Sequence, residues 1–239
     1  MTVYVSHGEK GGTGKTRLAM VLGDLLHKQG RPFVVVEGDK SGADVGRRYE
    51  GLTEIGYINL NRPEAMEAAF SSLGGWLEDY AAGKDVVVNL PGQASDTLDQ
   101  FAGLLADTVQ LLGQELVVYY SVGTLDLHTE NLARSMRDGL MSVVPIERQV
   151  VVLPELFGPP AGYHWHTASI REKYLAAGGK EGIMPLLKPA PLETIVRGTS
   201  GPYSALLSGT SPLKIADRAL LFRWLTAAHA VAALGVKNG

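Results

Sequence analysis

The stretch "YVSHGEKGGTGKTRLA" (residues 4–19) constrains the fold more than any other part of the chain. It joins a strand-forming run to a glycine-rich turn and then to helix-forming residues. Glycines let backbone N–H groups turn inward around phosphate oxygens, and the start of a helix adds a favourable dipole. Lys15 is placed for the β- and γ-phosphates and the Thr16 hydroxyl for Mg²⁺. We therefore expect a phosphate-binding loop; a glycine-rich turn with incidental lysines is the alternative.

Two features depart from the general phosphate-loop pattern. Glu9 stands where a glycine is expected, with Gly8 one place too early, and a second lysine, Lys10, precedes the glycines. The run from Lys10 to Thr16 resembles the signature of the deviant Walker A ATPases, the ParA/MinD group, in which the Glu9 position is not reserved for glycine. The resemblance implies that Lys10 crosses a nucleotide-sandwich dimer to the partner's phosphates, where it offsets buried negative charge. A solvated lysine at the loop mouth is the alternative.

The same resemblance extends to the residues expected to bind ATP and Mg²⁺. Asp39 in "EGDKSGAD" matches the second acid of the family's Asp-x-Asp motif and would orient the attacking water or hold it near Mg²⁺. A turn cap is the alternative for Asp39. The predicted catalytic residues are Lys10, Lys15 and Asp39. The predicted ATP-binding residues are Lys10, Gly11, Gly12, Thr13, Gly14, Lys15, Thr16 and Arg17.

The run "DVVVNLPG" resembles the Walker B strand of the family, but it places Asn89 where the family has a magnesium-linked aspartate. Asparagine accepts a hydrogen bond from a metal-bound water but brings no negative charge. We therefore expect slow hydrolysis and predict Thr16, Asp39 and Asn89 as the residues near Mg²⁺. For the adenine base the resemblance points to the region 182–198 but to no particular residue.

Short apolar runs alternate with helix-period segments along the chain, as in a parallel sheet covered on both faces. We predict one doubly wound, mostly parallel α/β domain over residues 1–239. The expected strands are Thr2–Ser6, Pro32–Glu37, Asp85–Leu90, Leu116–Ser121 and Gln149–Leu153. The expected helices are Lys15–Gln29, Pro63–Ala82, Thr97–Leu112, Thr124–Leu140, Thr167–Ala177 and Leu213–Leu234.

Composition excludes several classes of protein. The chain has no cysteine, which rules out disulfides, thiolate zinc sites and iron–sulfur clusters. Its net charge of −3 gives no global basic field for nucleic acid. No apolar run reaches the ~20 residues that span a bilayer. The beginning of the sequence lacks the layout of a signal peptide, so we expect a cytoplasmic protein.

Three further features have competing interpretations. His164 and His166 in "HWH" could hold a metal, but a segment packed by its aromatic residue, over the nucleotide or a partner, is preferred. The alanine-rich final helix is expected to pack against the sheet, not on a membrane. Scattered solvated arginines are preferred to a DNA-facing patch on a dimer. The arginines considered for that patch are Arg134, Arg137, Arg148, Arg171, Arg197, Arg218 and Arg223.

The resemblance implies an ATP-dependent switch. ATP and Mg²⁺ bind, two subunits close through Lys10, a partner is engaged, and hydrolysis, stimulated by a separate protein, resets the homodimer. The cargo would be plasmid or chromosome DNA or another cellular body, and "EGDKSGAD" and "NLPG" resemble accessory ParA-like proteins of plasmid stability or mobilisation loci. Two alternatives stay open: a metabolic P-loop enzyme of the amidoligase or small-molecule kinase type, and a hydrolysis-poor, nucleotide-gated binding module.

Overall fold

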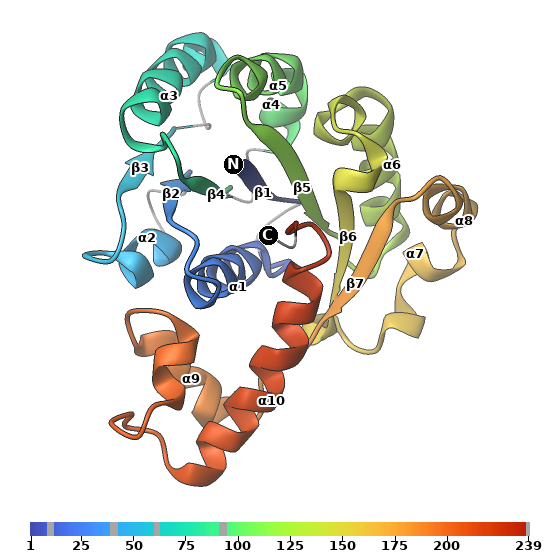
Figure 1. The fold of residues 1–239 in the computed structure, drawn as a ribbon. Helices are drawn as coiled ribbons and strands as arrows, with labels where there is room; N and C mark the ends of the chain where they lie inside the picture. The colour runs from blue at the N-terminus through green and yellow to red at the C-terminus, as the bar shows by residue number, and fades with distance from the viewer. Residues whose placement is uncertain (9–11, 39–42, 60–62, 91–94, 238–239) are drawn as a thin grey trace.

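The computed structural model describes residues 1–8, 12–38, 43–59, 63–90 and 95–237. Its centre is a seven-stranded sheet with the order β3-β2-β4-β1-β5-β6-β7 (Figure 1). Every neighbouring pair of strands is parallel, which confirms the predicted fold class. The strands are β1 (Thr2–Gly8), β2 (Phe33–Glu37), β3 (Ile55–Tyr57), β4 (Asp85–Asn89), β5 (Glu115–Ser121), β6 (Gln149–Pro154) and β7 (Lys180–Met184).

Helices cover both faces of this sheet (Figure 1). One face carries α1 (Lys15–Lys28), α2 (Asp44–Tyr49), α9 (Ala190–Gly198) and α10 (Ile215–Ala232). The opposite face carries α3 (Met66–Tyr80), α4 (Ser95–Gln100), α5 (Ala102–Leu111), α6 (Asp126–Asp138), α7 (His164–Thr167) and α8 (Ser169–Ala176). Short 3-10 turns join them: η1 (Pro63–Ala65), η2 (Leu140–Val143), η3 (Ile146–Arg148), η4 (Glu155–Phe157), η5 (Pro160–Gly162) and η6 (Tyr203–Leu207).

The core consists of two apolar clusters, one on each face of the sheet. Successive residues of a strand point to opposite faces: Val3 and Val5 of β1 belong to the cluster under α3 to α8, whereas Tyr4 belongs to the cluster under α1 and α10. The inner strands are buried on both faces, which is why they are almost continuously apolar.

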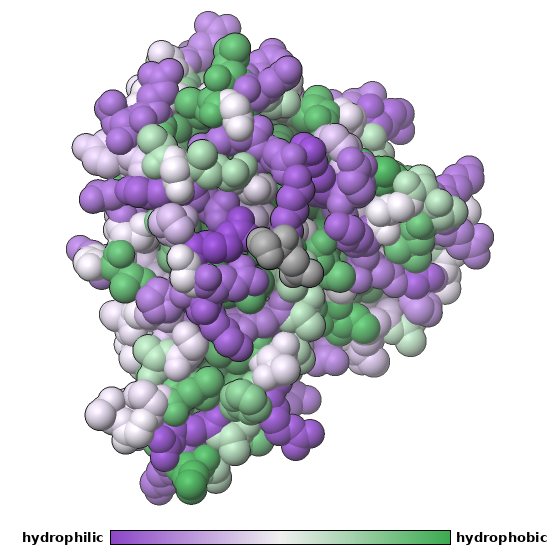
Figure 2. Space-filling view, viewed as in Figure 1, coloured by the Kyte–Doolittle hydropathy of each residue, from purple (hydrophilic) through white to green (hydrophobic). Residues whose placement is uncertain are grey.

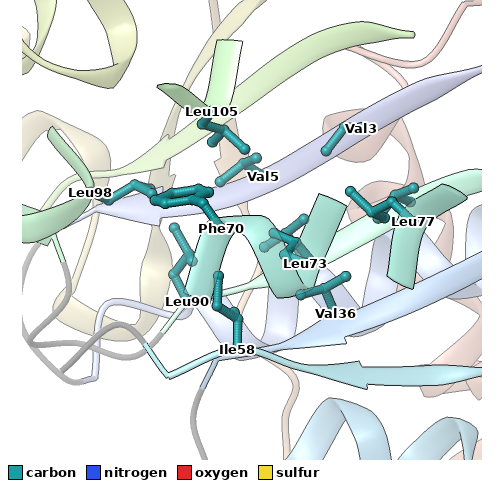
Figure 3. Close-up of a pocket in the computed structure, with 12 residues that line it drawn as sticks. Val3, Val5, Val36, Ile58, Phe70, Leu73, Leu77, Leu90, Leu98 and Leu105 are labelled. Carbon is teal, nitrogen blue, oxygen red and sulfur yellow. The ribbon is translucent and has the colours of Figure 1, made fainter. Parts of the chain in front are cut away.

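A small void of about 20 Å³ remains between the sheet and the helices α3, α4 and α5. Phe70 and Leu73 of α3 face Val5 of β1 and Leu105 of α5 across it (Figure 3). Its lining is entirely apolar, so it offers no partner to a polar ligand or to water. The void belongs to the core packing and is not a functional site.

The five predicted inner strands are confirmed to within two residues at each end. The edge strands β3 and β7 were missed, because one has three residues and the other reads "KEGIM" without an alternating or continuous apolar pattern. The helix predicted over residues 97–112 is wrong as one element, since it divides at Phe101 into α4 and α5. The helices α2, α7 and α9 were also missed.

The segment "HWH" lies in the short helix α7, which runs from His164 to Thr167. Trp165 is fully buried in the core, where its indole Nε1 donates to Glu181 Oε2 at 3.1 Å. The preferred packing by an aromatic residue is therefore confirmed, but Trp165 covers neither the nucleotide loop nor an exposed surface.

The helix α10 packs on α1, β7 and η6, through buried residues that include Leu221, Trp224 and Leu225. Its other side exposes Ile215, Leu220 and Phe222, and hydrophobic and hydrophilic residues are interspersed over the α9–α10 region in the view of Figure 2. Within the described ranges, no helix combines the length and apolar character needed to cross a bilayer.

Candidate nucleotide-binding site

The glycine loop lies between the carboxyl end of β1 and the start of α1, at the edge of the sheet where parallel α/β folds bind ligands. Gly12 and Gly14 have left-handed backbone conformations, with φ of 96° and 81°, which a residue with a side chain adopts at a cost. Gly14 is the N-cap of α1. The hydroxyl of Ser6 donates to the carbonyl of Lys15 at 2.9 Å and thereby ties the strand to the first turn of the helix.

Lys15 is nearly buried in the loop, with 5% of its surface exposed. Its Nζ donates to the hydroxyl of Thr13 at 3.3 Å, so the ammonium group stays over the loop at the N-terminus of α1. Backbone N–H groups, the helix dipole and this cation all favour an anion at the same place. The arrangement is that of a phosphate-binding loop, as the sequence predicts.

The glycine at position 8 has a role in the sheet. Gly8 is the last residue of β1 and pairs with Ser121 of β5. Its φ is 132°, and a Cβ atom there would lie 2.4 Å from the carbonyl oxygen of Ser121. Close approach of β5 therefore requires this glycine, which explains why it stands outside the loop pattern.

An open pocket of about 350 Å³ begins at the loop, a size typical of small-molecule sites. Its walls come from the glycine loop, α1, α2, the residue after β4, η4, α9 and η6. The lining residues are Gly12, Thr13, Gly14, Lys15, Thr16, Arg17, Met20, Asp44, Leu90, Leu156, Arg197 and Tyr203. A smaller, mainly apolar slot of about 60 Å³ adjoins Gly14 and Arg17. Pro154, Leu156 and residues 184–187 complete its lining.

The helix α9 is held over this pocket by two arginines from other elements. Arg17 of α1 forms an ion pair of 2.5 Å with Glu193 and lies 5.7 Å from the ring of Trp224. The buried Arg48 of α2 donates to the carbonyls of Val196 and Gly201 at 2.6 and 2.7 Å. Arg17 thus lines the pocket, and its charge is partly offset by Glu193.

Glu37 and Asn89 meet at the carboxyl ends of β2 and β4. Both side chains are buried, with 0% and 1% exposure. The amide Nδ2 of Asn89 donates to Glu37 Oε1 at 2.7 Å, and the backbone N–H of Gly46 in α2 donates to Glu37 Oε2 at 3.2 Å. The Oδ1 atom of Asn89 is buried and has no hydrogen-bond partner among the described residues. An orphaned acceptor of this kind fits a metal-bound water.

The residues predicted near Mg²⁺ fit that ion only in part. Thr16 lines the pocket and Asn89 ends β4, and Mg²⁺ is held in proteins by oxygen ligands and retained waters. Over the described ranges, no three His, Asp or Glu side chains are grouped to hold a metal ion. When bound with a nucleotide, Mg²⁺ would supply positive charge to the phosphate oxygens.

Some predicted site residues lie outside the described part of the chain. These are Lys10 and Gly11 of the loop and Asp39 after β2. Their predicted roles stay predictions.

Sequence reasoning pointed to the region 182–198 for the base without choosing a residue, and the fold brings Arg197 of that region to the pocket. It missed Tyr203, which comes from a segment far along the chain that no local motif marks. Burial raises the pKa of the Tyr203 hydroxyl, in spite of the nearby Arg17 and Arg48, so Tyr203 is neutral at the wall. Leu156 and Met184 follow β6 and end β7, and only the sheet order places them together.

No protein-family model matches the chain. Protein MobD of Acidithiobacillus ferrooxidans is 25% identical, and the match covers 96% of both chains. A nucleotide-binding protein of Archaeoglobus fulgidus in complex with ADP superposes with a TM-score of 0.51 over 82% of this chain and 85% of its own, at 13% identity.

A chain of the MinC:MinD cell division protein complex of Aquifex aeolicus superposes with a TM-score of 0.50 over 95% of this chain and 96% of its own, at 16% identity. At these identities the superpositions concern the fold. This chain has the parallel strand order and the glycine loop between β1 and α1 described above. The chain therefore has the ParA/MinD-like P-loop fold that its glycine loop predicted.

Proposed function

We propose that the protein is an ATP-dependent dimerising switch of the ParA/MinD type. The observation that carries this proposal is the loop itself. The left-handed Gly12 and Gly14 and the buried Lys15 lie at the start of α1, at the mouth of a pocket large enough for a nucleotide. In this proposal ATP and Mg²⁺ close two subunits, and slow hydrolysis resets them. We further propose that residues 1–239 act as one ATPase domain.

Dimerisation is supported by the surface around the pocket. Leu156 and Phe157 of η4 expose 54% and 43% of their surface, and Leu125 and Leu127, after β5, expose 58% and 53%. These four large apolar side chains all follow the carboxyl ends of strands, on the same edge of the sheet as the loop. A second copy bound over this edge would cover them together with the nucleotide.

The similarity to protein MobD fits an accessory ParA-like protein of a plasmid stability or mobilisation locus, which would position or partition cargo. Direct contact with DNA is less well supported. Four of the arginines considered for a patch, Arg134, Arg137, Arg148 and Arg171, form ion pairs with carboxylates. Their charge is partly offset, so we propose that cargo is reached through a partner protein.

The test is the solution mass, measured by light scattering with Mg-ADP and then with a non-hydrolysable Mg-ATP analogue. We expect the analogue alone to double the mass of the wild-type protein. Lys10→Ala should bind the analogue and remain monomeric, because the lysine acts across the dimer. Arg31→Ala, on the opposite edge of the sheet beside Asp85, is the control and should dimerise normally.

Binding of the analogue with no change of mass would overturn the dimerising switch. It would favour a P-loop enzyme that acts on a small acceptor within the pocket. Dimerisation with negligible phosphate release would instead favour the hydrolysis-poor binding module.

A further inference from the structure

The Glu37–Asn89 pair divides between two side chains what a single aspartate would provide. Glu37 brings a negative charge, and Asn89 brings an oxygen that can accept from a metal-bound water. Asn89 lies between β2 and β1 in the sheet, opposite Glu37 on one side and Ser6 on the other. Ser6 is bonded to Lys15 in the first turn of α1. The pair is therefore next to the strand that carries the phosphate loop, at the same edge of the sheet.

The hydrogen bond between the two side chains determines which way the amide faces. Nδ2 of Asn89 is the donor to Glu37 Oε1 at 2.7 Å, so Oδ1 is directed away from the carboxylate. This oxygen is buried and without a hydrogen-bond partner in the described part of the chain. A buried acceptor that stays unpaired costs free energy, and a water on a metal ion would satisfy it.

We propose that Glu37 supplies the negative charge that Asn89 lacks, and that it is a positioning residue which holds the Asn89 oxygen available to a metal-bound water. The inference rests on the proposed nucleotide-binding function and deepens it. The acid on β2 then supplies the charge that is missing from β4, and the amide of Asn89 on β4 transmits its effect. A neutral Asn89 is then compatible with a working Mg²⁺–nucleotide site.

The bonding pattern around Glu37 predicts the behaviour of single and double variants. The carboxylate accepts from both Asn89 and Gly46. In Glu37→Gln one of these donors meets an NH₂ group, and in Asn89→Asp two carboxylates face each other. In the double variant the new amide on β2 donates to the new carboxylate on β4 and its oxygen accepts from Gly46, so both of these hydrogen bonds are kept.

The first measurement is thermal unfolding of the protein without nucleotide. We expect Glu37→Gln and Asn89→Asp each to lower the melting temperature by about 3–8 °C, and the double variant to lie within about 2 °C of wild type. A double variant that loses the sum of the two single losses would show that the side chains are not coupled and would overturn the inference.

The second measurement is the gain in ADP affinity on adding Mg²⁺, from calorimetry in EDTA and in Mg²⁺. The pair carries one negative charge in wild type and in the double variant, but none in Glu37→Gln. We expect the increase in ADP affinity on adding Mg²⁺ to be about 10-fold smaller in Glu37→Gln than in wild type. The double variant should keep the wild-type increase. Asp85→Asn is the matched control, because Asp85 is a buried carboxylate at the opposite end of β4, paired with Arg31 at 2.7 Å. Asp85→Asn should lower the melting temperature but leave the Mg²⁺-dependent gain in ADP affinity unchanged.

The outcomes separate this inference from the proposed function. If the wild-type protein binds no nucleotide, the proposed function fails and the inference fails with it. If the wild-type protein binds ADP with a Mg²⁺-dependent gain that Glu37→Gln retains, the inference alone is overturned. A merely structural Glu37 would change the melting temperature without changing the Mg²⁺ gain.

Discussion

At the scale of single residues, Gly8 is required by the sheet and not by the phosphate loop that follows it. We predict that Gly8→Ala destabilises the protein by about 2–4 kcal/mol, because the new Cβ combines a strained backbone with overlap against β5. The overlap is with the carbonyl of Ser121, 2.4 Å from the ideal Cβ position. Urea unfolding measures the loss.

Gly30→Ala is the control for strain alone, since Gly30 has a φ of 66° but nothing within 4 Å of its Cβ position. It should cost about 1 kcal/mol. Equal losses in the two variants would show that contact with β5 is not what requires Gly8.

At the scale of elements, Asp99 joins four segments that are distant in sequence. This residue of α4 accepts hydrogen bonds from the hydroxyl of Ser135 in α6 at 2.9 Å and from the N–H of Leu140 in η2 at 2.7 Å. It also lies 3.3 Å from the buried His7 of β1. Burial by itself would raise the pKa of the Asp99 carboxyl, but His7, Leu140 and Ser135 outweigh it and leave the pKa below its usual value.

The direction of this pKa shift predicts how stability depends on pH. A pKa that is lower in the folded state adds stability that is full above the unfolded pKa of about 4 and is lost as pH falls through the folded pKa. We expect Asp99→Asn to lower the free energy of unfolding by about 1–2 kcal/mol at pH 7. The difference from wild type should shrink below pH 4, as measured by urea unfolding at several pH values. A difference that stays constant down to pH 3 would contradict the charged contact.

At the scale of the whole molecule, the pocket collects residues from elements along most of the chain, from α1 to η6. A ligand that binds there ties both ends of the sequence together and stabilises the folded state by mass action. We predict that Mg-ADP at 100 times its dissociation constant adds about 2.7 kcal/mol, or roughly 5–10 °C in melting temperature. Differential scanning calorimetry measures the shift.

Lys15→Met tests whether that stabilisation comes through the loop. The variant should melt at a temperature that Mg-ADP leaves nearly unchanged, because the cation over the phosphates is removed. A full shift in Lys15→Met would place the nucleotide elsewhere on the molecule.

The sequence by itself determined the parts that depend on local pattern. The loop from Gly12 to Thr16 is marked by glycines and a lysine at fixed spacing, and the five inner strands are marked by continuous apolar runs, since burial on both faces demands them. The boundaries of α1 and α10 were also predictable within two residues, because α1 lies between the glycine loop and Gly30 and the packed face of α10 repeats with the period of a helix.

Only the tertiary structure decided which distant residues share the site. Glu37 and Asn89 are 52 positions apart in the sequence. Their hydrogen bond exists because β2 and β4 are neighbours in the sheet. The edge strand β7 and the helix α9 carry weak local patterns, yet they place Met184 and Arg197 at the pocket. Strand order and helix packing depend on contacts that no local run of residues encodes. The motif could therefore be predicted from the sequence, whereas the hydrogen bond between Glu37 and Asn89 could not.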